Sequence, residues 1–216
     1  MQAHPNAYYM PAAVEVEHFG KAGSGETLPS DLAVYPRPLL GYVGALIPQK
    51  VDVELLADLA RAYPKWSICL IGPAVGRERA AFDLLLGGLP NVHFLGRKAY
   101  EQLPAYYAGL DAVLLPYRLN EHTRAMFPLQ FVEAMAAGKP MVVTELDAVA
   151  HYRLSRTLCR VARDRAEFVR FVEEVLAEPL KTQDVALRQE HARRYDLGQR
   201  VHDIETLILH SLSRRR

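Results

Sequence analysis

The feature of this sequence that most constrains its fold is the alternation of apolar runs with helical patterns between residues 39 and 144. Each apolar run has the length of a strand, and an amphipathic stretch follows it. Because neighbouring parallel strands need a crossover and are covered on both faces, this order is typical of an α/β fold with a doubly wound parallel sheet. The predicted strands are residues 39–44, 66–72, 91–96, 111–116 and 140–144, and the predicted helices are residues 52–63, 77–86, 100–109 and 129–137.

The segments on either side of this alternation follow other patterns. Residues 1–34 hold several prolines and glycines with little periodicity, which indicates a linker, so folded structure is expected to begin near Tyr35. We assign residues 35–195 to one domain and residues 196–216 to a C-terminal helix with a basic tail. The end of that tail, residues 213–216, either touches an anionic membrane surface or is a solvated terminus.

The last third of the chain is predicted to be mostly helical. A short strand over residues 158–161 precedes an amphipathic helix, for which Asp164 is a suitable N-cap. Two further helices are expected over about residues 182–194 and 199–212.

Composition excludes several classes of protein. The 26 basic and 25 acidic residues nearly cancel, so no nucleic-acid partner is indicated. Cys69 and Cys159 lie in apolar runs, where a thiol acts as a small hydrophobe, which fits a reducing, cytoplasmic location. We find no signal peptide and no apolar run long enough to span a membrane.

The carboxyl ends of the predicted strands are where a ligand is expected to bind, because open parallel sheets bind ligands there. Gly44, Gly72 and Gly96 stand at three of these ends, although glycine is also the ordinary residue between a strand and a helix. Lys50 follows in the first loop, either to reach a phosphate or as a solvated lysine. The common glycine-rich mononucleotide and dinucleotide fingerprints are absent.

The richest candidate segment is residues 116–140, where a polar loop enters a helix led by Pro128. The start of such a helix offers free backbone amides and a positive dipole end, which suit a diphosphate. Glu133 lies one turn inside, either to accept hydrogen bonds from a sugar diol or as an exposed helix glutamate. We predict no metal site, because His122 has no histidine or cysteine at ligand spacing.

At this segment the sequence resembles the C-terminal domain of family 4 retaining glycosyltransferases. That family has the GT-B architecture, in which two Rossmann-like domains face each other. The last block, FPLQFVEAMAAGKPMVVTEL, is similar to the family's donor-binding helix, and PNVHFLGRKAYEQLPAYYAGLDAVLLPY resembles the block before it. GYVGALIPQKVDVELLADLA resembles the family's first strand, loop and helix, and NAYYMPAAVEVEHFGK is similar to its interdomain linker. The loop NEHTRAMFP resembles a bacterial, polysaccharide-building subgroup.

The resemblance implies roles for single residues. Lys50 matches the basic residue that holds the donor diphosphate and, with Arg124, would stabilise the leaving group. Glu133 matches the residue that binds ribose hydroxyls. The remaining predicted nucleotide-sugar contacts are Gly44 in the first loop, Gly96 and Arg97 around the nucleobase, and the amides of Leu129 and Gln130 at the helix start.

Two positions depart from the family's pattern, both at the sugar end of the predicted site. Ala125 stands where the family has the first glutamate of a pair whose second member matches Glu133, and Ala45 stands where the family has an arginine. The donor sugar would then be held by other residues of the loop, for which the candidates are Asn120, Glu121, Thr123 and Arg124.

The function that follows is transfer of a glycosyl group from a UDP- or GDP-linked donor to an acceptor hydroxyl, without a cofactor. The acceptor-binding half is expected to be an N-terminal domain or a separate subunit, so we expect this chain to be inactive alone. The alternatives are a non-catalytic nucleotide-binding module and one half of a GT-B-type nucleotide-sugar epimerase. Peripheral contact with the inner face of the membrane, through the basic tail, is a further expectation.

Overall fold

A single parallel sheet organises the computed structural model, which describes residues 7–8, 10, 12–23, 25, 27–74 and 76–213. Its six strands are ordered β3-β2-β1-β4-β5-β6, and every neighbouring pair is parallel. This is the strand order of the Rossmann fold, so the predicted fold class is confirmed. The strands are β1 (Leu39–Val43), β2 (Ser67–Ile71), β3 (Val92–Gly96), β4 (Ala112–Leu115), β5 (Met141–Thr144) and β6 (Arg160–Ala162).

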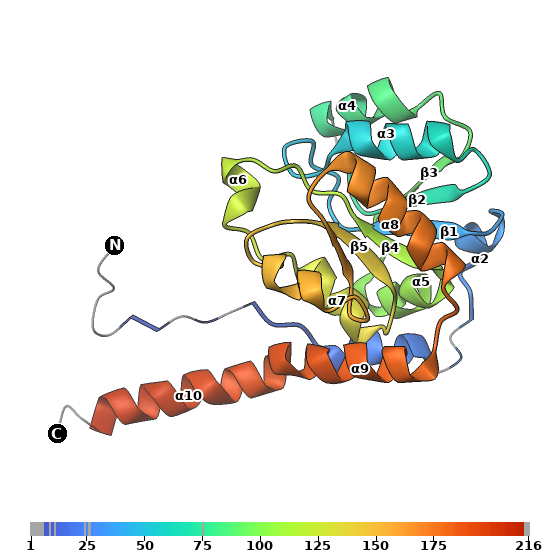
Figure 1. Cartoon of the computed structure of the whole chain (residues 1–216). Coiled ribbons are helices and arrows are strands. Elements are labelled where there is room, and N and C mark those ends of the chain that lie inside the picture. The colour runs from blue at the N-terminus through green and yellow to red at the C-terminus, as the bar shows by residue number, and fades with distance from the viewer. Residues whose placement is uncertain are drawn as a thin grey trace.

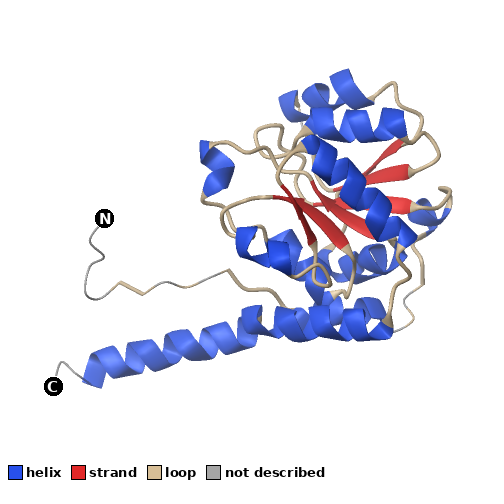
Figure 2. Ribbon diagram, in the orientation of Figure 1, coloured by secondary structure: helices blue, strands red, loops and turns tan. Residues whose placement is uncertain are grey.

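Helices cover both faces of this sheet (Figure 1 and Figure 2). On one face lie α3 (Val53–Ala62), α4 (Arg77–Leu86) and α8 (Arg165–Ala177). The other face carries α5 (Leu103–Gly109), which the 3-10 turn η2 (Tyr100–Gln102) precedes, together with α7 (Leu129–Ala136). Helix α9 (Thr182–Ala192) packs against α7. The strands of the sheet centre are buried along their whole length, as two covered faces require.

Side-chain caps set where two of these helices begin. The Asp52 carboxylate accepts a hydrogen bond from Leu55 N at 3.1 Å, and the Asp164 carboxylate accepts one from Glu167 N at 2.8 Å. Each bond satisfies a backbone N–H that the first turn leaves without a partner. The predicted cap at Asp164 is therefore confirmed. Cys69 and Cys159 are both buried and free, as their apolar surroundings predict.

Folded structure begins well before Tyr35, so that expectation is wrong. Residues before it form α1 (Val16–Gly20), the 3-10 turn η1 (Lys21–Gly23) and α2 (Ser30–Ala33). The Phe19 ring is 1% exposed and packs edge-on against Tyr107, with ring centroids 5.6 Å apart. Isolated apolar side chains such as Val14 and Leu32 drive this packing without a periodic pattern to reveal it. Residues 1–6, 9, 11, 24 and 26 of the predicted linker lie outside the described residues.

The C-terminal helix α10 (Leu197–Ser213) continues from α9 through the turn η4 (Arg193–Tyr195) and extends beyond the body of the domain (Figure 1). Its apolar side chains are exposed, among them Ile208 at 55% and Leu212 at 58%. The predicted helix is confirmed, whereas residues 214–216 of the basic tail lie outside the described chain. In the part of the chain that the structure covers, no helix is both long and apolar enough to cross a membrane.

Candidate functional site

The loops that follow β1, β2 and β3 meet at the carboxyl edge of the sheet through three glycines. Gly44, Gly72 and Gly96 have φ angles of +151°, +153° and +69°, which L side chains rarely adopt. Gly72 N donates to Gly96 O at 2.9 Å, and a Cβ at Gly72 would lie 1.8 Å from Gly44 O. Glycine is therefore required at residue 72 for the first two loops to pack against each other.

The loop after β4 folds onto the first loop and brings Lys50 into this edge. Arg118 N donates to Lys50 O at 2.8 Å, and Val51 forms an isolated antiparallel bridge with Tyr117. Tyr117 N in turn donates to Thr144 Oγ1 at 2.6 Å, which ties the loop to the end of β5. The predicted first-loop and fourth-loop residues are thus brought together.

The start of α7 faces the same loops. The backbone N–H groups of Leu129 and Gln130 have no acceptor among the described residues, as expected in a first helical turn. A Cβ at Gly44 would lie 2.7 Å from Gln130 Nε2, so the side chain of Gln130 lies directly over the first loop. The Tyr117 hydroxyl donates to Gln130 Oε1 at 3.1 Å and holds that side chain. The helix start and the first loop therefore form one surface.

Glu133 lies one turn further into α7 and is largely buried. The fully buried Tyr107 hydroxyl donates to Glu133 Oε2 at 2.8 Å. Burial raises the pKa of the Glu133 carboxyl, and the Tyr107 hydrogen bond and the positive charge of His18 oppose that shift. Oxygen Oε1 has no donor among the described residues, so it is available to a ligand hydroxyl.

The predicted sugar-binding loop contains a short helix, α6 (Glu121–Arg124), which the sequence did not reveal. Asn120 caps it: its Oδ1 accepts from Thr123 N at 3.0 Å, and its Nδ2 donates to Gln49 O at 2.9 Å. Thr123 is fully buried, and its hydroxyl bonds within the loop. In this structure Asn120 and Thr123 therefore hold the shape of the loop, whereas Glu121 and Arg124 are exposed.

Three basic side chains of this edge lack an acidic partner. Lys50 is partly exposed, and Arg97 and Arg124 are exposed. None of the three forms a salt bridge with another described residue. Uncompensated cations beside free backbone amides favour an anionic ligand. His122 is exposed, and the part of the chain that the structure describes contains no group of three or more His, Cys, Asp or Glu residues that could hold a metal ion.

Sequence reasoning missed the side chains that support these groups. Tyr107 and Tyr117 were placed only within apolar or loop segments, yet they hold Glu133 and Gln130. His18 belongs to the predicted linker, but its ring stacks on Tyr100 at a centroid distance of 4.4 Å and its charge acts on Glu133. The consecutive tyrosines of LPAYYAG were the available signal, because a buried tyrosine hydroxyl needs a polar partner.

Several solved structures share this fold, among them WaaG, a glycosyltransferase involved in lipopolysaccharide biosynthesis. Sucrose-phosphate synthase (tll1590) from Thermosynechococcus elongatus superimposes with a TM-score of 0.76 at 19% identity, over 94% of this chain and 52% of that chain. Anabaena Alr3699/HepE, solved in complex with UDP-glucose, superimposes with a TM-score of 0.68 at 21% identity, over 92% of this chain and 56% of that chain. At these identities the likeness shows the fold alone, which is that of one half of a GT-B structure.

Sequence comparison identifies the family. TuaH of Bacillus subtilis (strain 168), named as a candidate teichuronic acid biosynthesis glycosyltransferase, is 30% identical over 159 residues. The aligned part is 73% of this chain and 40% of that protein, so the chain spans less than half of this relative. A profile of the family described as Glycosyl transferases group 1 matches residues 37–178, which include the loops and helix of the carboxyl edge. Because that match covers well over half of the sequence, this chain belongs to the group 1 glycosyl transferases.

Proposed function

We propose that this chain is the donor-binding half of a GT-B glycosyltransferase and that it binds a UDP- or GDP-linked sugar at the carboxyl edge of its sheet. The observation that carries the proposal is the shared surface of the first loop and α7. There the Gln130 side chain lies over Gly44, the backbone amides of Leu129 and Gln130 at the same helix start are free, and the unpaired Lys50 belongs to the first loop. Amides and ammonium together suit a diphosphate.

Each end of the donor has its own candidate contacts. The diphosphate would bind Lys50 and the two amides, with Arg124 stabilising the charge that develops as the nucleotide leaves. Glu133, held by Tyr107 through one oxygen, would accept hydrogen bonds from the ribose through the other. Gly96 and Arg97, exposed at the end of β3, are the candidates for the nucleobase.

The sugar end is the less complete part of the proposed site. Ala45 and Ala125 are exposed and carry no polar group, and the Asn120 and Thr123 side chains are engaged within the loop. Arg124 and Glu121 are therefore the candidates that we retain for the donor sugar. This composition also favours the alternative in which the chain binds a nucleotide without catalysing transfer.

The acceptor, the product and the location belong to the same proposal. We infer transfer to a hydroxyl in glycan or polysaccharide synthesis, with retention of configuration, because both follow from the resemblance to family 4. The acceptor-binding half would be an N-terminal domain or a separate subunit. A cytoplasmic location, with the basic end against the inner face of the membrane, is tested by fractionating the producing cell.

Nucleotide binding by this chain tests the proposed site directly. The assay measures thermal stabilisation and calorimetric affinity with UDP, GDP, ADP and NAD, because a ligand that binds the native state raises its apparent stability. We expect UDP or GDP to bind, and Lys50→Ala to weaken that binding by about tenfold to a hundredfold, as loss of a charge-assisted hydrogen bond implies.

The matched control is Lys65→Ala, which removes an exposed lysine from the turn before β2 at the opposite edge. It should bind the nucleotide like the wild type. If no diphosphate stabilises the protein, or if Lys50→Ala and Glu133→Gln bind as tightly as Lys65→Ala, the proposed site is wrong.

Product analysis separates the candidate activities. This chain supplied with the nucleotide sugar and its acceptor-binding half should transfer the sugar, and the anomer of the product reports retention or inversion. Conversion of the donor sugar without any acceptor would indicate the epimerase instead. Binding without turnover in either assay would indicate the non-catalytic module.

A further inference from the structure

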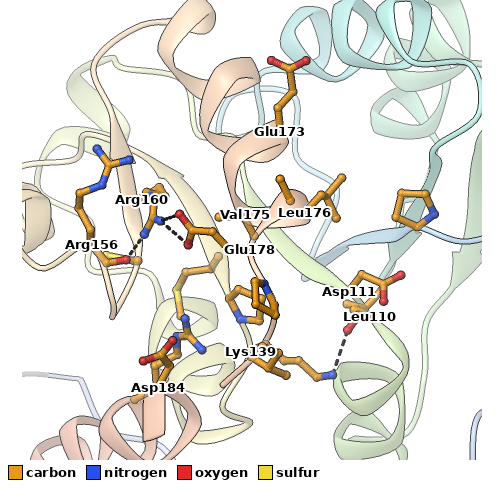
Figure 3. A pocket seen from close by; sticks show the side chains of 18 of the residues that line it. Leu110, Asp111, Lys139, Arg156, Arg160, Glu173, Val175, Leu176, Glu178 and Asp184 are labelled. Carbon is orange, nitrogen blue, oxygen red and sulfur yellow. Dashed lines mark hydrogen bonds and ion pairs between the residues drawn. The ribbon is translucent and has the colours of Figure 1, made fainter. Parts of the chain in front are cut away.

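A cavity of about 790 Å³ lies at the opposite edge of the sheet from the proposed donor site. It opens beside the amino ends of β1, β4, β5 and β6, between the end of α8 and the start of α9 (Figure 3). A volume of this order is typical of small-molecule sites, which measure about 300–1,000 Å³. None of the predicted donor contacts lines this cavity.

Lys139 lines this cavity with an ammonium group that has no acidic partner. Its Nζ donates to Ala108 O at 2.6 Å and to Leu110 O at 2.9 Å, both at the end of α5 (Figure 3 draws the bond to Leu110). An ammonium has three donors, so one N–H is left for a ligand. Burial lowers the pKa of Lys139 to about 8.

Arg188 reaches the same cavity from α9 and is 6% exposed. Its Nε donates to Leu158 O and its Nη1 to Gly138 O, each at 3.2 Å. Nη2 has no hydrogen bond to a described residue. Arg188 thus bonds to the backbone next to Lys139, and both side chains line the same cavity although they come from different elements.

The carboxylates closest to these cations are engaged elsewhere or lie beyond salt-bridge distance. Asp111 pairs with Arg37 and accepts from Leu39 N at 2.7 Å. Glu178 accepts two hydrogen bonds from Arg160, both at 2.6 Å. Burial lowers the pKa of Arg188, and the charge of Asp184 opposes that shift without forming a salt bridge with a described residue.

Arg188 is buried and Lys139 is partly buried, and neither forms a salt bridge with a described residue. Such cations are costly, because each has lost hydration without a paired counter-charge. A bound anion would supply that charge, and arginine and lysine are the usual partners of phosphate and carboxylate. The walls of the cavity are partly apolar, with Leu110, Met141 and Leu176 among the lining residues. A ligand that carries carbon as well as charge therefore matches the cavity.

We propose that this cavity binds a small organic anion, whose phosphate or carboxylate groups contact Lys139 and Arg188 and whose carbon skeleton lies against Leu110, Met141 and Leu176. The proposal does not depend on the donor site, because the two sites share no residue.

Trp66 gives a direct measurement, because it is the single tryptophan of the chain and lines this cavity. Its fluorescence is titrated with 3-phosphoglycerate, glucose 6-phosphate, citrate and inorganic phosphate. We expect saturable changes with at least one organic anion, weaker binding of inorganic phosphate, and about tenfold weaker binding in Lys139→Gln. The phosphate and carboxylate compounds show which group is preferred. Arg156→Gln, which changes an exposed lining residue, should bind like the wild type.

Lysine labelling supplies a second measurement that needs no substitution. Acetylation of each lysine is followed by mass spectrometry, and the organic anion should slow labelling of Lys139 several-fold while Lys65 is unaffected. A nucleotide that protects Lys50 but not Lys139 reports the donor site separately. The proposal is overturned if no anion of the panel protects Lys139 or changes the fluorescence, or if inorganic phosphate binds as tightly as every organic anion.

Discussion

Tyr107→Phe isolates the contribution of one buried hydrogen bond to the candidate site. The substitution removes only the hydroxyl, which donates to Glu133 Oε2 at 2.8 Å, and it leaves the buried ring in place. Hydrogen bonds to charged groups contribute about 1.5–3 kcal/mol, so we expect the free energy of unfolding at neutral pH to fall by about 2 kcal/mol. For a chain of 216 residues this corresponds to a decrease in Tm of about 4–8 °C.

The stability that Tyr107→Phe loses should depend on pH. Burial already raises the pKa of Glu133, and the Tyr107 hydrogen bond opposes that shift, so the pKa should rise further in the variant. Below this pKa the carboxyl is protonated, and the lost bond is one between neutral groups, worth about 1 kcal/mol. The difference in stability between wild type and variant should therefore be largest at neutral pH and should shrink as the pH falls.

Urea unfolding of both proteins, at neutral pH and at about pH 4, measures this difference. Tyr35→Phe is the control, because its hydroxyl has no hydrogen bond to a described residue. In the Glu133→Gln background, which has no charge to stabilise, Tyr107→Phe should cost about 1 kcal/mol at both pH values. A loss below about 0.5 kcal/mol at neutral pH, or one equal at both pH values, would refute the reasoning.

Two further predictions concern the backbone and the acid stability of the fold. Gly72→Ala should destabilise the protein by about 3 kcal/mol or more, because its Cβ would meet Gly44 O at 1.8 Å in a disfavoured backbone conformation. Urea unfolding measures this loss, and Gly88→Ala is the control, because a Cβ at Gly88 meets nothing within 4 Å. Equally small losses of stability in the two variants would contradict the prediction. Hydrogen bonds from the side chain of Arg163 and then from its backbone N–H lower the pKa of Glu167 to about 2. The ionised carboxylate should therefore stabilise the fold above its ordinary pKa of 4.5, and this stabilisation should be lost as the pH falls from 4.5 towards 2. Glu167→Gln should therefore flatten stability over that pH range, and an unchanged profile would argue against the assignment.

The positions of single candidate residues could be predicted where chemistry and place in the fold coincide in the sequence. Gly44, Lys50 and Glu133 were predicted from strand ends, a helix start and the resemblance, and the structure places all three at the carboxyl edge of the sheet. Thr123 shows the limit of that reasoning. Its hydroxyl looked available in a polar loop, but the short helix α6 turns it inward, because Asn120 caps that helix.

Contacts between segments far apart in the chain could not be predicted from the sequence, for a different reason. Tyr107 meets Glu133 across 26 residues, and Lys139 meets the carbonyl of Ala108 across 31. Neither pair has a local pattern, since helical and strand periodicities report only which face of an element is buried. The cavity that Lys139 shares with Arg188 could not be foreseen for the same reason.

The sequence by itself therefore determined the class of the fold. The apolar strands, the amphipathic helices and their order can be read locally along the chain, and a parallel sheet buried on both faces requires that pattern. It also predicted which loops and which helix start lie at the carboxyl edge of the sheet, where we propose that the donor binds, since strand ends and helix starts follow from that order. The tertiary structure alone decided that residues before Tyr35 belong to the packed domain and which side chains hold Glu133 and Gln130. Those contacts depend on packing between elements far apart in the chain. A single buried ring such as Phe19 is enough to attach a segment to the core, and it leaves no repeating pattern in the sequence.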